Sequence, residues 1–484
     1  MTRYDISTER QRIMTDPSSF SGAKTEQSEW TGYMDAMKRH VAKQRRKRKL
    51  TLTCLFCCLM VAFGYFGSEE TASKLPPQGA DAAQNVRKRQ PAKAREAALG
   101  QRELQAMMRK HPIVNSTEPD FRISHLNQTF LVETSLDPRL QQIGSKNLYT
   151  KTSRYIGIVV MEPATGRILA MVGYDKTRPG SNPCIQSDYP AASVFKIITT
   201  AAALEQHELN AASTLSFSGK KHTLYQSQIN PRAAAQKTSL REAFAQSINP
   251  VFGKIGALNL GKPPLDQFAR AFGFNRSIDF DMPLEPSPCR ITSEPFHLAQ
   301  IASGYNRTTR MSPVHGALIA SAILNGGRMP EPSLVDQVKD SFGNSVYRHR
   351  TETIGQVISP RSAAILRDIM GATIDAGTGR RSFAGYQKDP VLARLEIGGK
   401  TGSMDNDTHD VHFDWFVGFG SDHHSGKTIA VSALVGHEQF KGIRAGQYAR
   451  MMIREYFGRG QQAPAHAPAK PVLTKKIKAK PRNG

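Results

Sequence analysis

The stretch DYPAASVFKIITTAAALEQ, residues 188–206, is almost wholly apolar, yet it carries Ser193 and Lys196 three residues apart. Proline is favoured in the first turn of a helix and Asp188 could cap it, so the stretch predicts a helix that begins at about Pro190. Residues three apart share one face of a helix. We therefore expect the hydroxyl and the amine to be neighbours near the positive end of the helix dipole.

A lysine beside a serine suggests a nucleophile and its base. A serine hydroxyl attacks well only when a base takes its proton, and lysine can be that base only if its pKa falls from about 10.4 to about 7 or 8. Burial in an apolar helix would lower the pKa in this direction. In the competing interpretation Lys196 simply extends past Phe195 to solvent, and the same spacing of serine and lysine recurs elsewhere in the chain by chance.

A second polar pair lies in TSLREAFAQSINPVFGKIG, residues 238–256. Ser239 and Glu242 predict a capping box that begins one helix, and Asn249, which precedes a proline, predicts the cap of the next. Ser247 and Asn249 are then expected at a junction between two helices. The alternative interpretation is that Asn249 is only a helix cap.

A third motif lies in the stretch LEIGGKTGS, which ends a predicted strand with Lys400, Thr401, Gly402 and Ser403. Glycines in a strand allow another backbone or a ligand to approach closely. A phosphate-binding loop is excluded here because it would need glycine where Arg394 stands and a helix rather than a strand afterwards.

The remaining pattern predicts the fold. YIGIVVMEPATGRILAMVGY is a hairpin signal, with two runs rich in Val and Ile around a turn. Helical periodicity dominates from about 190 to 375, after which LARLEIGGKTGS, DWFVGFGS and KTIAVSALVGH predict three strands and residues 445–457 predict an amphipathic helix. We expect an α/β (α+β) fold, an antiparallel five-stranded sheet covered by helices, with an all-helical lobe beside it.

The N-terminal part predicts a membrane anchor. Residues 50–66 are uncharged and would form a helix of roughly 26 Å, close to the thickness of a bilayer core. The basic run at 43–49 precedes this span and predicts that the N-terminal end of the span faces the cytoplasm. A cleaved signal peptide is the alternative. The predicted parts are a cytoplasmic region (1–49), a transmembrane helix (50–66), a stalk (67–129), a catalytic domain (130–460) and a basic tail (461–484).

Most of the net charge of +24 comes from three segments near the two ends of the chain. The segments 38–49, 85–110 and 461–484 together carry twenty-two Lys and Arg and two acidic residues, so the body is nearly balanced. A nucleic-acid groove would need basic residues interleaved with aromatics on a folded face, so no nucleic-acid partner is expected.

Cys184 and Cys289 follow the predicted span and would lie in an oxidising compartment. We expect them to pair, with two buried free thiols as the alternative.

The order SxxK, then SxN, then KTG along the chain resembles the penicillin-binding proteins and the serine β-lactamases. The hairpin stretch above, the segment MSPVHGALIASAILNGGRMPEPSLV and the strand DWFVGFG also resemble the corresponding segments of a transpeptidase domain. Residues 130–460 thus resemble a membrane-anchored, monofunctional transpeptidase domain of the penicillin-binding family.

The resemblance implies a role for each motif. Ser193, with Lys196 as base, would attack the penultimate D-Ala of a peptidoglycan stem peptide, release the terminal D-Ala and form an acyl-enzyme. An amine of a neighbouring stem would then complete the cross-link. Ser247 would relay a proton to the leaving amine, and Asn249 would hold the peptide amide. The substrate-binding strand would supply Lys400, Thr401, Gly402 and Ser403.

The resemblance also implies an oxyanion hole made by the backbone N–H groups of Ser193 and Ser403. It implies no metal and no other cofactor. Several His and Asp residues near the predicted hairpin turns are interpreted as solvated turn residues rather than metal ligands; they are His409, His412, His423, His424, Asp405, Asp407 and Asp410.

Stem peptides and β-lactams are the implied ligands. Only about 60 residues separate the predicted span from the domain, too few for a glycosyltransferase module, so a separate glycan polymerase in the membrane is expected. The implied location is the bacterial inner membrane, single-pass, with the catalytic domain in the periplasm or outside the cell. The alternatives are a D,D-carboxypeptidase, a β-lactam-binding sensor, a non-catalytic cell-wall protein and a β-lactamase.

The basic run before the predicted span makes the topology testable. A reporter that is active only outside the cytoplasm, fused after Gly484, should be active because the basic side of the span stays inside. Activity of a reporter that works only in the cytoplasm would contradict this orientation.

Overall fold

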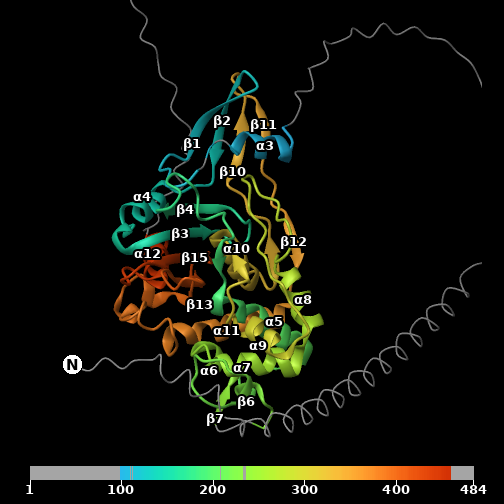
Figure 1. The fold of residues 1–484 in the computed structure, drawn as a ribbon. Helices are drawn as coiled ribbons and strands as arrows, with labels where there is room; N and C mark the ends of the chain where they lie inside the picture. The colour runs from blue at the N-terminus through green and yellow to red at the C-terminus, as the bar shows by residue number, and fades with distance from the viewer. Residues whose placement is uncertain (1–98, 110, 112, 208, 233–235, 459–484) are drawn as a thin grey trace, which may run out of the picture. The chain divides into compact units, whose positions relative to one another are not determined.

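The computed structural model describes residues 99–458 apart from 110, 112, 208 and 233–235. Its centre is a five-stranded antiparallel sheet with the order β13-β14-β15-β3-β4 (Figure 1). The strands are β3 (Ser153–Met161), β4 (Ile168–Asp175), β13 (Glu396–Asp405), β14 (His412–Ser421) and β15 (Thr428–His437). The antiparallel sheet is confirmed, and β3 pairs with β15 although the two are far apart in the chain.

Helices cover both faces of this sheet. The covering helices are α4 (Pro138–Lys146), α10 (Pro313–Leu324), α11 (Pro360–Asp375) and α12 (Ala445–Phe457). Ile156 and Ile158 of β3 belong to the core with α4 and α12, whereas Val159 and Met161 belong to the core with α10. Because both faces are buried, the central strands read as nearly continuous apolar runs. The predicted closing helix is confirmed.

A helical lobe contacts the free side of β13 through a short 3₁₀ turn, η3 (Ala192–Phe195). Its helices are α5 (Lys196–His207), α6 (Leu240–Ala245), α7 (Asn249–Lys254), α8 (Lys262–Ala271) and α9 (Pro295–Ser303). Figure 1 shows them gathered together below the sheet. A hairpin of β6 (Thr214–Phe217) and β7 (Gln236–Ser239) extends from the lobe.

The helix that carries Lys196 begins later than the sequence predicts. Tyr189 and Pro190 form a short strand, β5, paired with β8 (Arg310–Met311), and η3 follows before α5 starts. Asp188 caps no helix because a strand follows it, and its carboxylate lies 2.9 Å from the Arg178 guanidinium. Pairing with a strand far away in the chain therefore overrides the local helix signal.

The predicted stalk at 67–129 is wrong for its described part, which begins at Leu99. Helix α3 (Gln101–Met108) buries Leu104, Met107 and Met108 at helical spacing. The sheet beside it has the order β1-β2-β10-β11. Its strands are β1 (Asp120–His125), β2 (Gln128–Thr134), β10 (Val335–Lys339) and β11 (Ser345–Arg348). Half of this sheet comes from residues about 200 positions later, so the local sequence showed no complete core.

The predicted disulfide is also wrong, because Cys184 and Cys289 are both free and buried. Cys184 Sγ lies 3.3 Å from Val172 O, whereas Cys289 Sγ lies 3.7 Å from the Thr309 hydroxyl. Burial raises the pKa of each thiol to about 12, so neither is a reactive thiolate at neutral pH.

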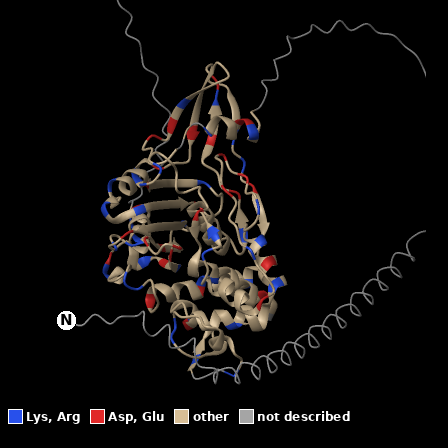
Figure 2. Cartoon of the chain, viewed as in Figure 1, with Lys and Arg blue, Asp and Glu red and all other residues tan. Residues whose placement is uncertain are grey.

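Basic and acidic side chains are interspersed over the described residues (Figure 2). Among these residues, no helix combines the length and the apolar character that crossing a bilayer requires. The predicted span at 50–66, the region 1–49 and the tail 461–484 lie outside the described residues.

Candidate active site

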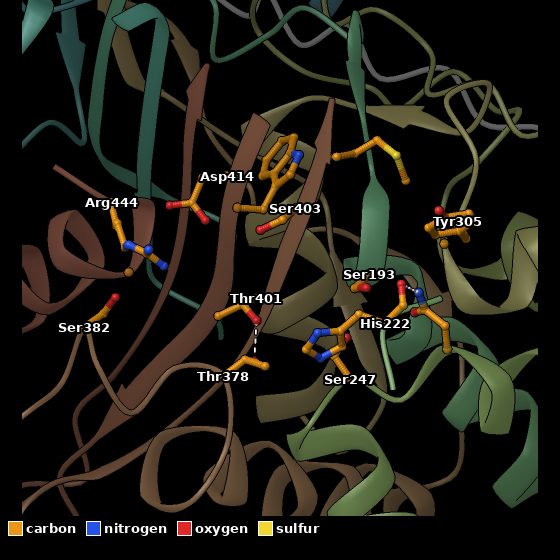
Figure 3. A pocket seen from close by; sticks show the side chains of 15 residues that line it. Ser193, His222, Ser247, Tyr305, Thr378, Ser382, Thr401, Ser403, Asp414 and Arg444 are labelled. Carbon is orange, nitrogen blue, oxygen red and sulfur yellow. Dashed lines mark hydrogen bonds between the residues drawn. The ribbon is translucent and has the colours of Figure 1, made fainter. Parts of the chain in front are cut away.

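A cavity of about 360 Å³ lies where the helical lobe meets β13 (Figure 3). Residues of all three sequence motifs line it, and they are Ser193, Ser247, Asn249, Thr401 and Ser403. Lys196, Lys400 and Gly402 lie directly behind these residues, and the two lysines are 0% exposed. The fold thus brings all eight predicted site residues together from η3 and the start of α5, the α6–α7 junction and β13.

Lys196 is held in place by three polar contacts. Its Nζ lies 2.8 Å from Ser193 Oγ, 2.8 Å from Asn249 Oδ1 and 2.5 Å from the Ser303 carbonyl oxygen. The interpretation in which Lys196 extends to solvent is therefore wrong. The fixed amine is within proton-transfer distance of the serine hydroxyl.

Burial lowers the pKa of Lys196 well below its ordinary value, and the charge of Lys400 lowers it further. A neutral amine has two N–H donors and one lone pair. The Ser303 carbonyl can only accept, and Asn249 presents Oδ1 because its Nδ2 donates to the His222 carbonyl at 3.0 Å. Both N–H groups are thereby used, so the lone pair remains for the hydroxyl hydrogen of Ser193. This is the arrangement that a general base requires.

Lys400 completes a pair of buried amines. Its Nζ lies 3.0 Å from Ser247 Oγ and 2.8 Å from the Thr401 carbonyl oxygen, and burial lowers its pKa to about 7. The rings of Phe244 and Phe252 lie 5.5 Å from the amines of Lys400 and Lys196, respectively. Two cations in so apolar a site would repel each other. Since the charge of Lys400 contributes to the lowered pKa of Lys196, we infer that Lys400 is the amine that carries charge and that Lys196 is the neutral base.

The backbone at both serines is unusual. Ala192, just before Ser193, has φ +48°, and Ser247 has φ +55°, so two residues with side chains adopt the left-handed region. At the end of α9, Gly304 approaches this turn so closely that a Cβ there would lie 1.9 Å from Ala192 O. Only glycine fits at that position. Such strain is common where a fold fixes a reactive side chain.

Asn249 is not the helix cap that the sequence predicts. It is the first residue of α7, and the cap position belongs to Ile248, which makes no side-chain cap bond. Instead, Asn249 bridges Lys196 and His222 through its amide, and its backbone N donates to Lys221 O at 2.7 Å. Its side chain therefore organises the cavity rather than the helix end.

The third motif lies on β13, an edge strand of the sheet. A Cβ on Gly402 would lie 3.2 Å from a methyl group of Val194, so glycine lets the strand approach the turn that carries the nucleophile. Thr401 Oγ1 lies 2.5 Å from Thr378 Oγ1, and Ser403 is exposed to the cavity. An edge strand has backbone groups free of the sheet ladder, and these face this side.

Other cavity residues were missed by the sequence reasoning. They are His222, Gly304, Tyr305, Thr378, Ser382, Met404, Asp414, Trp415, Arg444 and Gly446. Most come from loops and strand ends that are distant in sequence, and no short motif marks them. His412 and Asp405, considered as turn residues, are 2.6 Å apart and outside this lining. Among the described residues, no group of three or more His, Cys, Asp or Glu is arranged to hold a metal.

The depressed pKa of Lys196 gives the reaction a defined pH dependence. The rate of Ser193 acylation by a labelled penicillin should rise with pH, because the neutral amine is the base. The midpoint of this rise should lie well below about pH 10.4, the pKa of an ordinary lysine. Asn249→Asp would place a carboxylate against the amine and stabilise its cation, so the midpoint should move to higher pH. An unchanged midpoint in this variant would contradict the neutral-base assignment.

Asn249→Ala separates the bridging role from a capping role. Loss of the bridge should lower the acylation rate at least about 10-fold and the free energy of unfolding by about 1–3 kcal/mol, because buried polar groups lose a partner. If Asn249 were only a cap, the substitution would lower the free energy of unfolding by about 1 kcal/mol and leave the acylation rate unchanged. Stopped-flow acylation and denaturant unfolding of the same preparation distinguish these outcomes.

Comparison with known proteins identifies the family. Residues 156–454 match the model of the penicillin binding protein transpeptidase domain. The peptidoglycan D,D-transpeptidase PbpA of Mycobacterium tuberculosis is 29% identical over 351 residues, covering 63% of this chain and 67% of that protein. The imipenem acyl-enzyme complex of penicillin-binding protein A from M. tuberculosis superposes with a TM-score of 0.54 and 26% identity, covering 67% of this chain and 79% of that one. The D,D-transpeptidase domain of a peptidoglycan glycosyltransferase from Eggerthella lenta shares the fold, with a TM-score of 0.56, 23% identity, and coverage of 68% of this chain and 82% of that one. The chain therefore belongs to the penicillin-binding protein transpeptidase family.

Proposed function

We propose that this protein is a serine-type peptidoglycan D,D-transpeptidase that forms cross-links through an acyl-enzyme on Ser193 and is inhibited by β-lactams. The observation that carries the proposal is the buried Lys196 amine, 2.8 Å from Ser193 Oγ at the floor of a cavity. The relative named a D,D-transpeptidase and the acyl-enzyme structure of a similar protein support the same chemistry.

Acylation follows from the contacts in the cavity. Lys196 takes the hydroxyl proton of Ser193 as Oγ attacks the carbonyl of the penultimate D-Ala. The negative oxygen that forms would be stabilised by backbone N–H groups of Ser193 and Ser403, where one such donor is typically worth about 3 to 4 kcal/mol. The proton then passes to the leaving D-Ala nitrogen through Ser247, whose hydroxyl is 3.0 Å from the Lys400 amine.

Substrate recognition falls to β13 and the lobe. The terminal carboxylate of the stem peptide would bind beside Lys400, whose pKa of about 7 keeps a substantial fraction of it cationic at neutral pH. Thr401 and Ser403 supply hydroxyl donors in the cavity, and Gly402 lets the strand approach. Asn249 would hold the peptide amide of the donor stem.

The membrane setting belongs to the same proposal. The uncharged run at 50–66 and the basic run at 43–49 support a single-pass anchor in the bacterial inner membrane, with the catalytic domain in the periplasm or outside the cell. A separate glycan polymerase in that membrane would supply the strands to be cross-linked.

Labelling with penicillin tests the proposal. The folded protein should bind one labelled penicillin per molecule at Ser193, located by peptide mass spectrometry. Ser193→Ala should abolish labelling, and Lys196→Ala should slow it at least about 100-fold, as expected for loss of a general base. The absence of an adduct on the folded native protein would refute the assignment.

The fate of the adduct separates the alternatives. A long-lived adduct together with cross-linked products from stem peptides supports the transpeptidase. Rapid release of hydrolysed penicillin would indicate a β-lactamase. Hydrolysis of stem peptides without cross-linking would indicate a D,D-carboxypeptidase, and a long-lived adduct without any stem-peptide turnover would indicate a sensor.

A further inference from the structure

We propose that His222 is a second catalytic base, which deprotonates the ammonium group of the acceptor stem peptide before it attacks the acyl-enzyme. This inference rests on the proposed function. His222 lines the same cavity as Ser193 and Ser247, and Figure 3 shows its imidazole beside Ser247. It is exposed at the cavity rim, where an incoming second substrate would arrive.

The hydrogen bond of the ring fixes which nitrogen is free. His222 Nε2 lies 3.0 Å from the Gln246 carbonyl oxygen. Because a carbonyl oxygen can only accept, Nε2 carries the hydrogen, and Nδ1 of the neutral ring keeps its lone pair. Among the described residues no hydrogen-bond partner of Nδ1 is found, so this nitrogen is available to a ligand.

The loop that carries His222 is held firmly against the active site. The His222 carbonyl accepts a hydrogen bond from Asn249 Nδ2 at 3.0 Å, and the neighbouring Lys221 carbonyl accepts one from Asn249 N at 2.7 Å. The buried Gln228 side chain donates to Ser218 O at 2.9 Å and accepts from Tyr225 N at 2.9 Å. The backbone that carries the imidazole is thus held by the same asparagine that contacts the base of the first step, while the Gln246 carbonyl fixes the ring itself.

The proton balance of the second step requires another base. An alkylamine acceptor arrives as R–NH3⁺ at neutral pH, and an amide product keeps only one of its three N–H hydrogens. His222 Nδ1 takes the first proton and frees the lone pair of the amine, which then forms the C–N bond. Lys196, neutral again after the first step, takes the second proton and returns it to Ser193 Oγ as the ester C–O bond breaks. The imidazolium releases its proton to solvent.

His222→Gln provides the test, because glutamine can keep an N–H donor for the Gln246 carbonyl but has no basic nitrogen. Cross-linking to an alkylamine acceptor should fall at least about 10-fold. Acylation by penicillin and hydrolysis of the acyl-enzyme by water should stay within about two-fold, since neither begins with an ammonium ion. His424→Gln, the same change at an exposed turn outside the cavity, should leave all three rates unchanged.

A weakly basic acceptor distinguishes a base from a structural residue. Hydroxylamine is largely unprotonated at neutral pH, so His222→Gln should react with it at nearly the native rate. An equal loss with both amines, or no loss with either, would overturn the proposal. Failure of the native protein to acylate would instead refute the proposed function, and acylation of the native protein without any aminolysis would refute both its transpeptidase activity and this role.

Discussion

The contact between the Lys196 amine and the Ser193 hydroxyl depends on the exclusion of water from one small volume. An ammonium ion taken from water into such a site costs several kcal/mol, and each pKa unit corresponds to about 1.4 kcal/mol. The lobe avoids most of this cost by keeping the amine uncharged between two obligatory acceptors. The aromatic pair of Phe244 and Phe252, whose ring centres are 6.3 Å apart, maintains the low polarity beneath both lysines.

The same constraint explains why three separate elements must meet with little freedom. The nucleophile stands on a left-handed turn at Ala192, and Ser247 itself adopts a left-handed conformation. Neither conformation is favoured locally, so each must be stabilised by its surroundings. Gly304 and Gly402 allow the end of α9 and the edge strand β13 to come within contact of the turn. Chemistry and packing are therefore determined by the same few residues.

The sheet and the closing helix could be predicted from the sequence, because long apolar runs and helical periodicity are local signals. The grouping of the three motifs at one site was implied only by the resemblance to the penicillin-binding family, which rests on the order of those motifs. The start of α5 could not, since pairing of β5 with β8 overrides the proline and aspartate at 188–190. The bridging role of Asn249 was hidden because it depends on His222 and Lys196, which approach it only in the folded chain. His222 and Thr378 belong to no motif, so only the cavity identifies them.

The four-stranded sheet has a consequence for how the protein can be divided. Strand β2, before the region that matches the family, pairs with β10, which lies inside that region. A fragment that starts at the first residue of the family match would leave β10 paired only with β11, as an edge strand, and uncover Val335 and Val338, which are 0% exposed in the intact sheet. Exposed apolar edges of this kind recruit strands from other molecules and promote aggregation. The segment from Leu99 is thus an integral part of the folded unit, and soluble, monomeric protein is expected only from fragments that retain it.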